Sequence, residues 1–291
     1  MVLLLVVICM CMLISAILLG VYFYNTNNTT VETNSGDTGG DMGAGSMYLP
    51  VNDLKKNGGG AWNVQGKIDW KKSSVTTFQD EPVVRIVYGK DSGNSHHSGV
   101  GGIGFECAPK GLPTTSAMMS FQVYFEPGWE WSGGGKLLGF RIGFGDSSGG
   151  HHSPTGASCR ISFKKEGGAW LYVYPPENLP QKDPKLRRDD GSGIGLYQEN
   201  FPSGTFRIGK WNDVKIAVRI NTFDAGGKPN ADGQAYLEIN GRSATLKQMR
   251  WSRSPDLLIS VFNFVSFFGG SDPATVECAT LFKNFKLSRW D

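Results

Sequence analysis

Charged residues are scarce in this sequence, and so are the residue patterns that predict helices. Its 29 Lys plus Arg residues and 26 Asp plus Glu residues leave a formal charge of +3, and charged residues make up only 19% of the 291 residues. This balance excludes an acidic solvating tail and a strongly basic nucleic-acid binder, so we predict no nucleic-acid partner. After Met47, no stretch of about ten residues combines helical periodicity with helix caps, which excludes a helix bundle.

Cysteine is also scarce. Only Cys107, Cys159 and Cys278 follow the N-terminal segment, and they have no CxxC or Cys/His zinc spacing. At most one disulfide can form among them, with Cys107 and Cys278 as a conceivable pair, but three isolated buried thiols are favoured. No carboxylate cluster suggests Ca²⁺, and no phosphate-binding glycine loop precedes a helix. The sequence therefore predicts neither a metal nor a cofactor.

Glycine and aromatic residues, in contrast, are abundant. The chain has 40 Gly, and Phe, Trp and Tyr make up 12% of it, a mixture typical of turn-rich β proteins. Apolar and polar residues alternate at 121–126 and 214–221, as in strands with one face on a core, and 235–242 contain the Asn-Gly signal of a hairpin. We expect an all-β fold, an antiparallel β-sandwich of jelly-roll type. A closed barrel fits the pattern equally well.

The N-terminal residues form a long apolar run. Val2 to Tyr24 contains 23 residues without a charge, and roughly 20 apolar residues suffice to span a ~30 Å hydrocarbon core. We predict that residues 1–24 are a single-pass anchor. Within it, residues 2–24 form an N-terminal transmembrane helix that contacts the membrane. A cleaved signal peptide is the alternative, but it would begin with a basic region, and no Lys or Arg precedes this run.

Residues 25–47 are rich in Asn, Thr, Ser and Gly and show no alternation, which predicts a flexible tether. The remaining residues, 48–291, are then one globular domain. Overlapping glycosylation sequons at Asn27 and Asn28 would be used only if the tether enters a secretory lumen. Lys55 and Lys56 lie too far downstream for the positive-inside rule, so charge leaves the orientation open.

Two neighbouring segments place polar and aromatic side chains on one face of the expected sheet. Alternation in 158–163 and in 169–174 separates an apolar face from a face with hydroxyls, an arginine and three aromatic rings. The short connection between the segments predicts a hairpin, so both sets share one surface. That surface would carry Ser158, Arg160, Trp170, Tyr172 and Tyr174. Lys136, which follows a triple-glycine turn, would join them if its segment belongs to the same sheet.

This set of side chains suits an acidic sugar. Aromatic faces stack on pyranose rings, Arg and Lys pair with carboxylates, and Tyr hydroxyls transfer protons. The competing interpretation is an inter-sheet or protein-contact surface with ordinary pairing of Tyr and Arg. Residue chemistry alone favours that second interpretation.

The spacing of Lys136, Ser158-x-Arg160 and Tyr172-x-Tyr174 resembles the active-site pattern of polysaccharide lyase family 14, the alginate and glucuronan lyases of chlorella viruses and marine molluscs. The segments GGGKLLGF at 133–140, SGIGLYQENFPSGTFRIGKWNDVKIAVRINT at 192–222 and FVSFFGGSDP at 264–273 also resemble segments of that family. The resemblance runs from about Trp129 onward, and residues 48–127 match only loosely. The loop GDSSGGHHSPTGASC at 145–159 departs from the Gly- and Cys-rich loop of many members.

The resemblance implies β-elimination on a 4-linked polyuronate, an acidic polysaccharide such as glucuronan or alginate. Arg160 and Lys136 would neutralise the uronate carboxylate and so make its C5 proton more acidic. Tyr172 and Tyr174 would act as base and acid, in an order left open, and Ser158 would orient the substrate. Further substrate contacts are expected from Trp170, Gln122, Tyr124, Arg85 and His151.

Histidine is the alternative base. The domain's histidines form the pairs His96-His97 and His151-His152 in Gly/Ser-rich loops, where adjacent side chains rarely chelate one metal well. We expect exposed loop histidines. His151 or His152 acting at the rim of the cleft is the alternative.

Two roles without catalysis stay open: a polyuronate-binding module that lacks turnover, and a structural domain displayed on a membrane or a virus particle. The complete set of Lys, Ser, Arg and Tyr favours catalysis. We expect the C-terminal domain to lie outside the cytoplasm and to act on cell-wall or extracellular polysaccharide. Association with a virion follows from the family resemblance alone.

Overall fold

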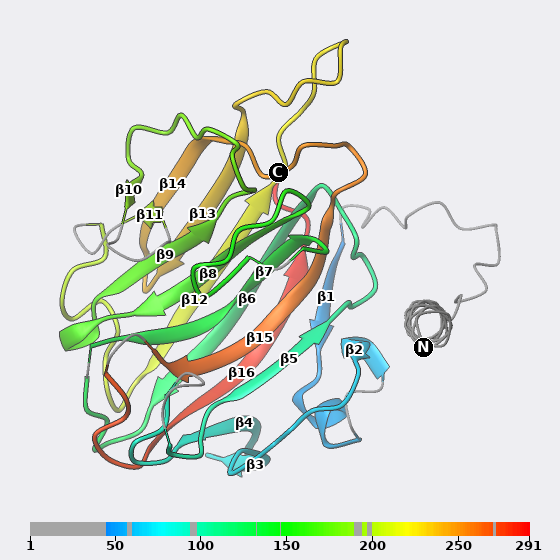
Figure 1. Cartoon of the computed structure of the whole chain (residues 1–291). Helices are drawn as coiled ribbons and strands as arrows, with labels where there is room; N and C mark the ends of the chain where they lie inside the picture. Colours follow the sequence, from blue (N-terminus) through cyan, green and yellow to red (C-terminus); the bar gives the residue numbers. More distant parts are fainter. Residues whose placement is uncertain are drawn as a thin grey trace, which may run out of the picture. The chain divides into compact units, whose positions relative to one another are not determined.

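The computed structural model describes residues 45–291 except 57–59, 94–97, 132, 146, 189–193, 197–199 and 270–271. In this part of the chain, antiparallel strands form two separate sheets that lie face to face (Figure 1). The predicted all-β sandwich is confirmed, and the closed-barrel alternative is wrong because the strands belong to two sheets. Helical structure among these residues consists of the short 3₁₀ turns η1 (Val51–Lys56), η2 (Gly60–Trp62) and η3 (Lys165–Gly167).

The first sheet, sheet A, has the strand order β14-β13-β12-β6-β16-β4-β3, with β1 paired to β16. Its strands are β1 (Ser46–Leu49), β3 (Ser74–Phe78), β4 (Glu81–Tyr88), β6 (Ser116–Phe125), β12 (Trp211–Arg219), β13 (Gly233–Ile239), β14 (Arg242–Met249) and β16 (Cys278–Ser288). The strands expected at 121–126 and 214–221 are found in β6 and β12, which end at Phe125 and Arg219 and are neighbours in this sheet.

The second sheet, sheet B, has the order β10-β11-β9-β8-β7-β15-β5-β2. Its strands are β2 (Val64–Gln65), β5 (Ile103–Cys107), β7 (Gly135–Gly143), β8 (Gly156–Phe163), β9 (Ala169–Tyr174), β10 (Arg187–Arg188), β11 (Ile194–Leu196) and β15 (Ile259–Phe268). Sheet B faces the viewer in Figure 1, where the orange strand β15 runs between β7 and β5.

Apolar side chains fill the space between the two sheets. On β6, Phe121, Val123 and Phe125 are buried in this core, as their alternation predicts. From sheet B, Phe140 of β7 and Phe262 of β15 pack edge to face, with ring centroids 5.5 Å apart. The alternate residues of each strand therefore point away from the core, to the outer face of their own sheet.

The chain crosses repeatedly from one sheet to the other. Strands β4 and β6 belong to sheet A, while β5 and β7 belong to sheet B, and the same change occurs along β14, β15 and β16. These crossings insert β15, from the C-terminal part of the chain, between β5 and β7. Residues from three distant parts of the sequence therefore share the outer face of sheet B.

The predicted anchor at 1–24 and most of the predicted tether lie outside the described residues. The tether was expected to extend to residue 47, but Ser46 and Met47 already pair with Ser288 and Leu287 as the start of β1. Among the residues that the structure describes, no helix is long and apolar enough to cross a membrane.

The three cysteines of the sandwich are free thiols, as favoured from the sequence. Cys107 of β5 and Cys278 of β16 are both free, so the alternative of a Cys107–Cys278 disulfide is wrong. Burial raises the pKa of the Cys107 and Cys159 thiols far above its ordinary value. Burial, together with the nearby charge of Glu130, raises the pKa of Cys278 to about 12.

The raised pKa values predict thiols that react slowly in the folded protein. A rise of the pKa of Cys278 from 9.0 to about 12 reduces its thiolate fraction at pH 8 roughly a thousandfold. Peptides that contain Cys107, Cys159 or Cys278 are expected to take up iodoacetamide at pH 8 only after denaturation, as measured by mass spectrometry. A disulfide-linked pair of these peptides, or rapid labelling of the folded chain, would contradict this assignment.

Candidate active site

Three adjacent strands of sheet B, β7, β8 and β9, carry the predicted catalytic residues. Their antiparallel pairing sets residues directly opposite one another, and opposite residues point to the same face. Three rows across the strands result: Lys136–Ser162–Trp170, Gly139–Arg160–Tyr172 and Arg141–Ser158–Tyr174. The predicted hairpin of 158–163 and 169–174 is confirmed, and the segment of Lys136 does belong to the same sheet.

An irregularity in β7 decides which of its side chains reach this face. The pairing of β7 with β8 shifts between Lys136 and Gly139, so residues on the two sides of the shift differ in register. Without the shift, strict alternation would put Lys136 and Arg141 on opposite faces, because their positions differ by an odd number. With it, both cations lie opposite serines of β8 on the outer face.

The aromatic side chains of β9 form a cluster of their own, separate from the main core. Trp170, Tyr172 and Tyr174 are buried to 1%, 5% and 3% exposure. The rings of Trp170 and Tyr172 meet edge to face at 4.4 Å, and those of Tyr172 and Tyr174 at 5.1 Å. The two phenol oxygens are 2.9 Å apart and share a hydrogen bond. The sheet therefore presents two directly coupled proton-transfer groups.

Positive charges lie on this aromatic row. The Nζ atom of Lys136 is 3.1 Å from the ring centroid of Tyr172, and Nζ of Lys164 is 4.7 Å from that of Trp170. Arg160 lies directly opposite Tyr172 on the neighbouring strand and is 9% exposed. Ring faces are negative, so these contacts hold the ammonium group of Lys136 beside the phenol of Tyr172 and that of Lys164 beside the indole of Trp170. An anion that enters this site meets cations from both β7 and β8.

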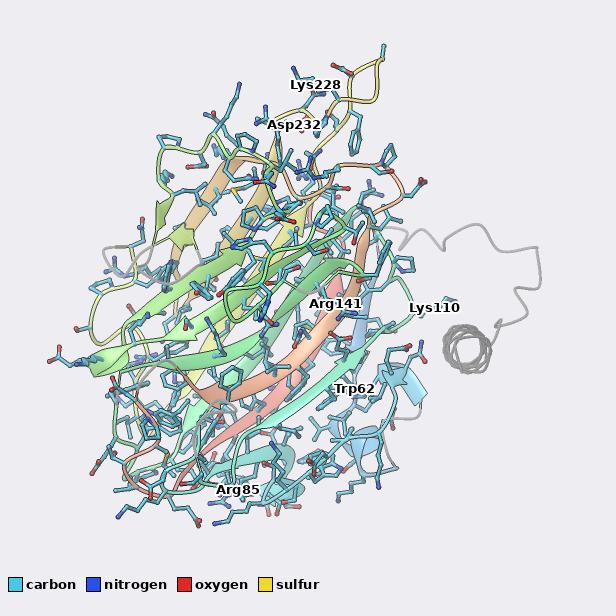
Figure 2. All side chains as sticks on the ribbon, viewed as in Figure 1. Trp62, Arg85, Lys110, Arg141, Lys228 and Asp232 are labelled. Carbon is cyan, nitrogen blue, oxygen red and sulfur yellow. The ribbon has the colours of Figure 1, made fainter. Side chains whose placement is uncertain are left out.

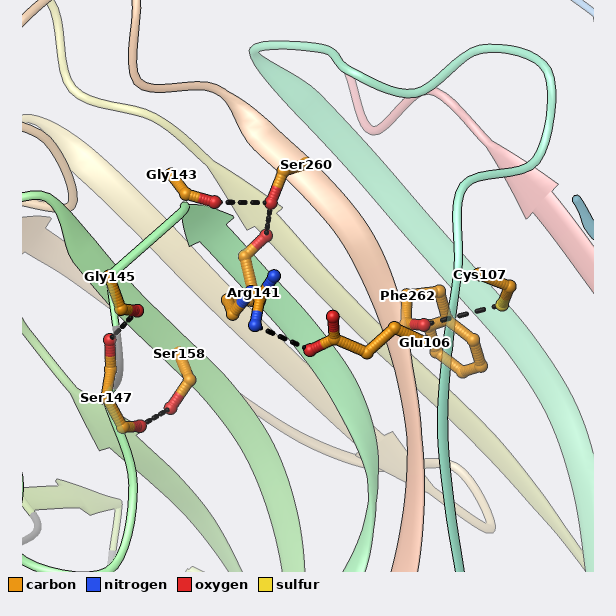
Figure 3. A network of polar contacts seen from close by, with 9 residues as sticks. All are labelled: Glu106, Cys107, Arg141, Gly143, Gly145, Ser147, Ser158, Ser260 and Phe262. Atoms are coloured by element: carbon orange, nitrogen blue, oxygen red, sulfur yellow. Dashed lines mark hydrogen bonds and ion pairs between the residues drawn. The ribbon is translucent and has the colours of Figure 1, made fainter. Parts of the chain in front are cut away.

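The loop between β7 and β8 contacts the same row. The Oγ of Ser158 donates a hydrogen bond of 2.6 Å to the carbonyl oxygen of Ser147, and Ser147 in turn contacts Gly145 (Figure 3). Further along this loop, the backbone amide of Gly150 donates to the hydroxyl of Tyr174 at 3.3 Å. In this structure, the Ser158 hydroxyl, which was expected to orient substrate, connects the loop to β8.

The loop histidines of this region are exposed, as expected. His152 has its ring 5.2 Å from that of Tyr174, and its Nδ1 lies 3.3 Å from the carbonyl oxygen of Pro175. His151 is exposed, and its backbone amide donates to Ser148. The pair His96-His97 lies outside the described residues.

Three predicted substrate contacts lie on the other sheet. Gln122 and Tyr124 of β6 and Arg85 of β4 alternate with core residues and so point to the outer face of sheet A. Arg85 makes two hydrogen bonds of 2.8 and 2.9 Å to Glu126, which raise its pKa further. Figure 2 places Arg85 far from Arg141 of sheet B. The structure does not bring these three residues together with Lys136, Arg160 and the tyrosines.

Several residues near the site were missed by the sequence reasoning. These are Lys164, Ser162, Arg141, Glu106 and Asn263. Ser162 and Lys164 carried a usable signal, because they belong to the hairpin already identified. Arg141 was hidden by the register shift of β7, and Glu106 and Asn263 reach the same face only because of the long-range pairing of β5 and β15. Among the described residues, no group of three or more His, Cys, Asp or Glu is placed to hold a metal ion.

The outer face of this antiparallel β-sandwich combines lysine and arginine with hydrogen-bonded tyrosines, and comparison with known proteins shows to which class of protein the chain belongs. The sequence model described as Polysaccharide lyase 14 matches residues 76–285, more than two thirds of the chain. The chain belongs to polysaccharide lyase family 14, a family of lyase enzymes, which confirms the resemblance seen in the sequence.

Relatives with known structures support this membership. The alginate lyase vAL-1 from a Chlorella virus is 43% identical, with a TM-score of 0.78 over 84% of this chain and 99% of that chain. The marine PL-14 alginate lyase from Aplysia kurodai is 25% identical, with a TM-score of 0.67 over 85% of this chain and 99% of that chain.

A curated relative is the exolysin of Paramecium bursaria Chlorella virus 1, 29% identical over 203 residues. The match covers 62% of this chain and 30% of exolysin, so the chain spans about a third of the length of that protein.

Gly139 keeps β7 and β8 in the register that builds the site. A Cβ atom at this position would overlap the carbonyl oxygen of Cys159 and lie 2.6 Å from the Cα of Arg160. We expect Gly139→Ala to lower the free energy of unfolding by about 1–3 kcal/mol, as overpacking does. In the control Gly104→Ala, the nearest atom is Val265 Cγ2 at 3.7 Å, and a change within about 0.5 kcal/mol is expected. Equal midpoints of the two variants in guanidinium unfolding would contradict this role of Gly139.

Proposed function

We propose that this domain cleaves a 4-linked polyuronate, alginate or glucuronan, by β-elimination. The observation that carries the proposal is the contact of Lys136 with Tyr172 beside the hydrogen-bonded pair Tyr172–Tyr174. Cations and proton-transfer groups within one buried cluster are what this elimination needs, because the substrate is an anion whose reacting C–H bond is a weak acid.

Neutralisation of the carboxylate is the first requirement of the reaction. The C5 proton of a uronate becomes more acidic when the adjacent carboxylate is held by cations, since the charge that develops on it is then stabilised. Arg160 and Lys136 provide these cations from neighbouring strands, and the guanidinium of Arg160 can bind a carboxylate with two parallel hydrogen bonds. In the proposed complex, the reacting carboxylate lies between these two side chains.

Proton transfer is the second requirement. A positive charge next to the ring of Tyr172 stabilises the phenolate, the form that accepts a proton. The pair of phenols takes the proton from C5, the C5–H electrons form the C4=C5 double bond, and the C4–O4 bond breaks. The departing O4 receives a proton from the same pair, which regenerates the starting state. The hydrogen bond of 2.9 Å couples the two hydroxyls in these steps.

The choice of polymer rests on the relatives. The solved structures from a Chlorella virus and from Aplysia kurodai are named as alginate lyases, and we extend that substrate to this chain as the first candidate. Glucuronan is the second candidate, because it presents the same carboxylate at C5 and the same 4-linkage. The crossings of the chain between the two sheets support the jelly-roll description of the domain.

The proposal includes a place of action. The uncharged run from Val2 to Tyr24 supports a single-pass anchor, followed by a tether that holds the lyase domain outside the cytoplasm. An anchored lyase would act on cell-wall or extracellular polysaccharide near that membrane. The relatedness to chlorella virus proteins supports association with a virion.

The lyase activity is tested by the ultraviolet absorbance of the new double bond conjugated to the carboxylate, with alginate and glucuronan as substrates. We expect the absorbance to rise with the full chain and to fall at least about 100-fold in rate with Tyr174→Phe or Lys136→Ala, the loss typical of a proton-transfer group. The matched controls are Tyr48→Phe and Lys228→Ala, both at exposed positions. If the folded wild type binds a polyuronate but forms no double bond, the domain is a binding module and the proposal fails.

The anchor is tested separately by extraction of membranes at alkaline pH. We expect the full chain to stay in the membrane pellet and a chain without residues 2–24 to appear in the supernatant, because the apolar run is the proposed attachment. Mature chains whose N-terminus begins after residue 24 would instead support a cleaved signal peptide.

A further inference from the structure

Asn263 is a buried polar residue on the outer face of sheet B that the proposed reaction does not use. It lies on β15 opposite Glu106 of β5 and opposite Gly139 of β7. Its neighbours in sequence, Phe262 and Phe264, belong to the main core, so the amide points to the same outer face as Arg160. The residue is 4% exposed, yet its Oδ1 accepts no hydrogen bond within the described part of the chain.

Within the described part of the chain, a second buried polar atom without a hydrogen-bond partner belongs to Arg141, which is two positions along β7 from Gly139, the residue opposite Asn263. Arg141 reaches across β15 and forms an ion pair with Glu106, with 2.8 Å between Nη1 and Oε1 (Figure 3). Its Nε, however, is buried and donates no hydrogen bond to any described residue. Arg141 thus contributes a buried donor to this part of the face, and Asn263 contributes a buried acceptor. Unsatisfied buried groups of this kind are costly and call for a ligand or a function.

We propose that Asn263 and Arg141 form a subsite for a hydroxyl group of the sugar residue that adjoins the reacting pair. A hydroxyl both donates and accepts, so a single sugar hydroxyl satisfies the Oδ1 of Asn263 and the Nε of Arg141 together. A carboxylate offers only acceptors and leaves Asn263 unsatisfied. Glu106 already compensates the charge of Arg141, which makes this part of the face suited to a neutral group.

The position of the subsite fits a neighbouring sugar rather than the reacting one. Asn263 is two strands away from Arg160, which is ~10 Å at the usual strand spacing and more than the width of one pyranose ring. Gly139 stands between them in the row and has no side chain, so nothing on β7 separates the two positions. The subsite rests on the proposed lyase function. It adds to that function the requirement for a substrate longer than the two sugars that flank the cleaved bond.

The test compares the full chain in detergent with two variants that each remove one partner. Asn263→Leu keeps the approximate shape but removes the acceptor, and Arg141→Lys keeps the cation near Glu106 but removes the Nε donor. Each variant is also made with Tyr174→Phe, and binding of saturated alginate and glucuronan disaccharides and hexasaccharides is measured by calorimetry. Gln234→Ala is the matched control, an amide on the outer face of sheet A.

We expect both variants to weaken hexasaccharide binding about tenfold, the loss of one hydrogen bond, and to leave the disaccharide unchanged. In the active background, KM for the polymer should rise while kcat changes little. The melting temperature of Asn263→Leu should be equal or higher, because the substitution removes an unsatisfied buried acceptor. A residue kept only for structure would show the reverse, a lower melting temperature with unchanged KM.

Unchanged hexasaccharide affinity in both variants would overturn the subsite. Asn263 and Arg141 would then hydrogen-bond only to water. This result is distinct from a failure of the proposed function, in which the wild type forms no double bond from any polyuronate. If Asn263→Leu does not fold, the Kd of Arg141→Lys for the hexasaccharide decides alone. Weaker binding in a chain that proves inactive would support the subsite and refute the lyase.

Discussion

The Lys136 ammonium can lie 3.1 Å from the centroid of the Tyr172 ring only when β7, β8 and β9 pair in one register. The contact itself is worth about 0.5–2 kcal/mol, whereas the register is fixed by the burial of alternate apolar residues against sheet A. A slip of one residue in β9 would turn Leu171 and Val173 outward and the tyrosines inward. The same core that stabilises the sandwich therefore holds the charged groups in place.

The outer face of sheet B divides into two electrostatic zones. Over β7, β8 and β9, Lys136, Lys164 and Arg160 meet the aromatic row, and this zone suits a carboxylate. Toward β15 and β5, Glu106 compensates the positive charge of Arg141 in an ion pair, so this zone suits hydroxyl groups. A polyuronate presents both kinds of group along its chain, so the two zones together match one extended ligand better than a single small anion.

The sequence predicts the parts of this structure that depend on local pattern. Alternation in 158–163 and 169–174 is local, and it places Arg160 and the tyrosines on one face correctly. Alternation cannot tell which of two sheets a strand enters. For this reason the sequence did not reveal that Gln122, Tyr124 and Arg85 lie on sheet A. The register shift in β7 and the insertion of β15 between β5 and β7 are properties of the pairing. The roles proposed for Arg141 and Asn263 therefore could be inferred only from the structure.

The most direct test of the account is a crystal structure of the full chain, or of its sandwich domain, as the Tyr174→Phe variant with a bound hexauronate. The account predicts one sugar carboxylate in contact with Arg160 and Lys136, and the C5 atom of that sugar next to the hydroxyl of Tyr172. An oligosaccharide bound on the outer face of sheet A, near Tyr124 and Trp211, would contradict it. So would a ligand on sheet B whose carboxylates avoid both cations.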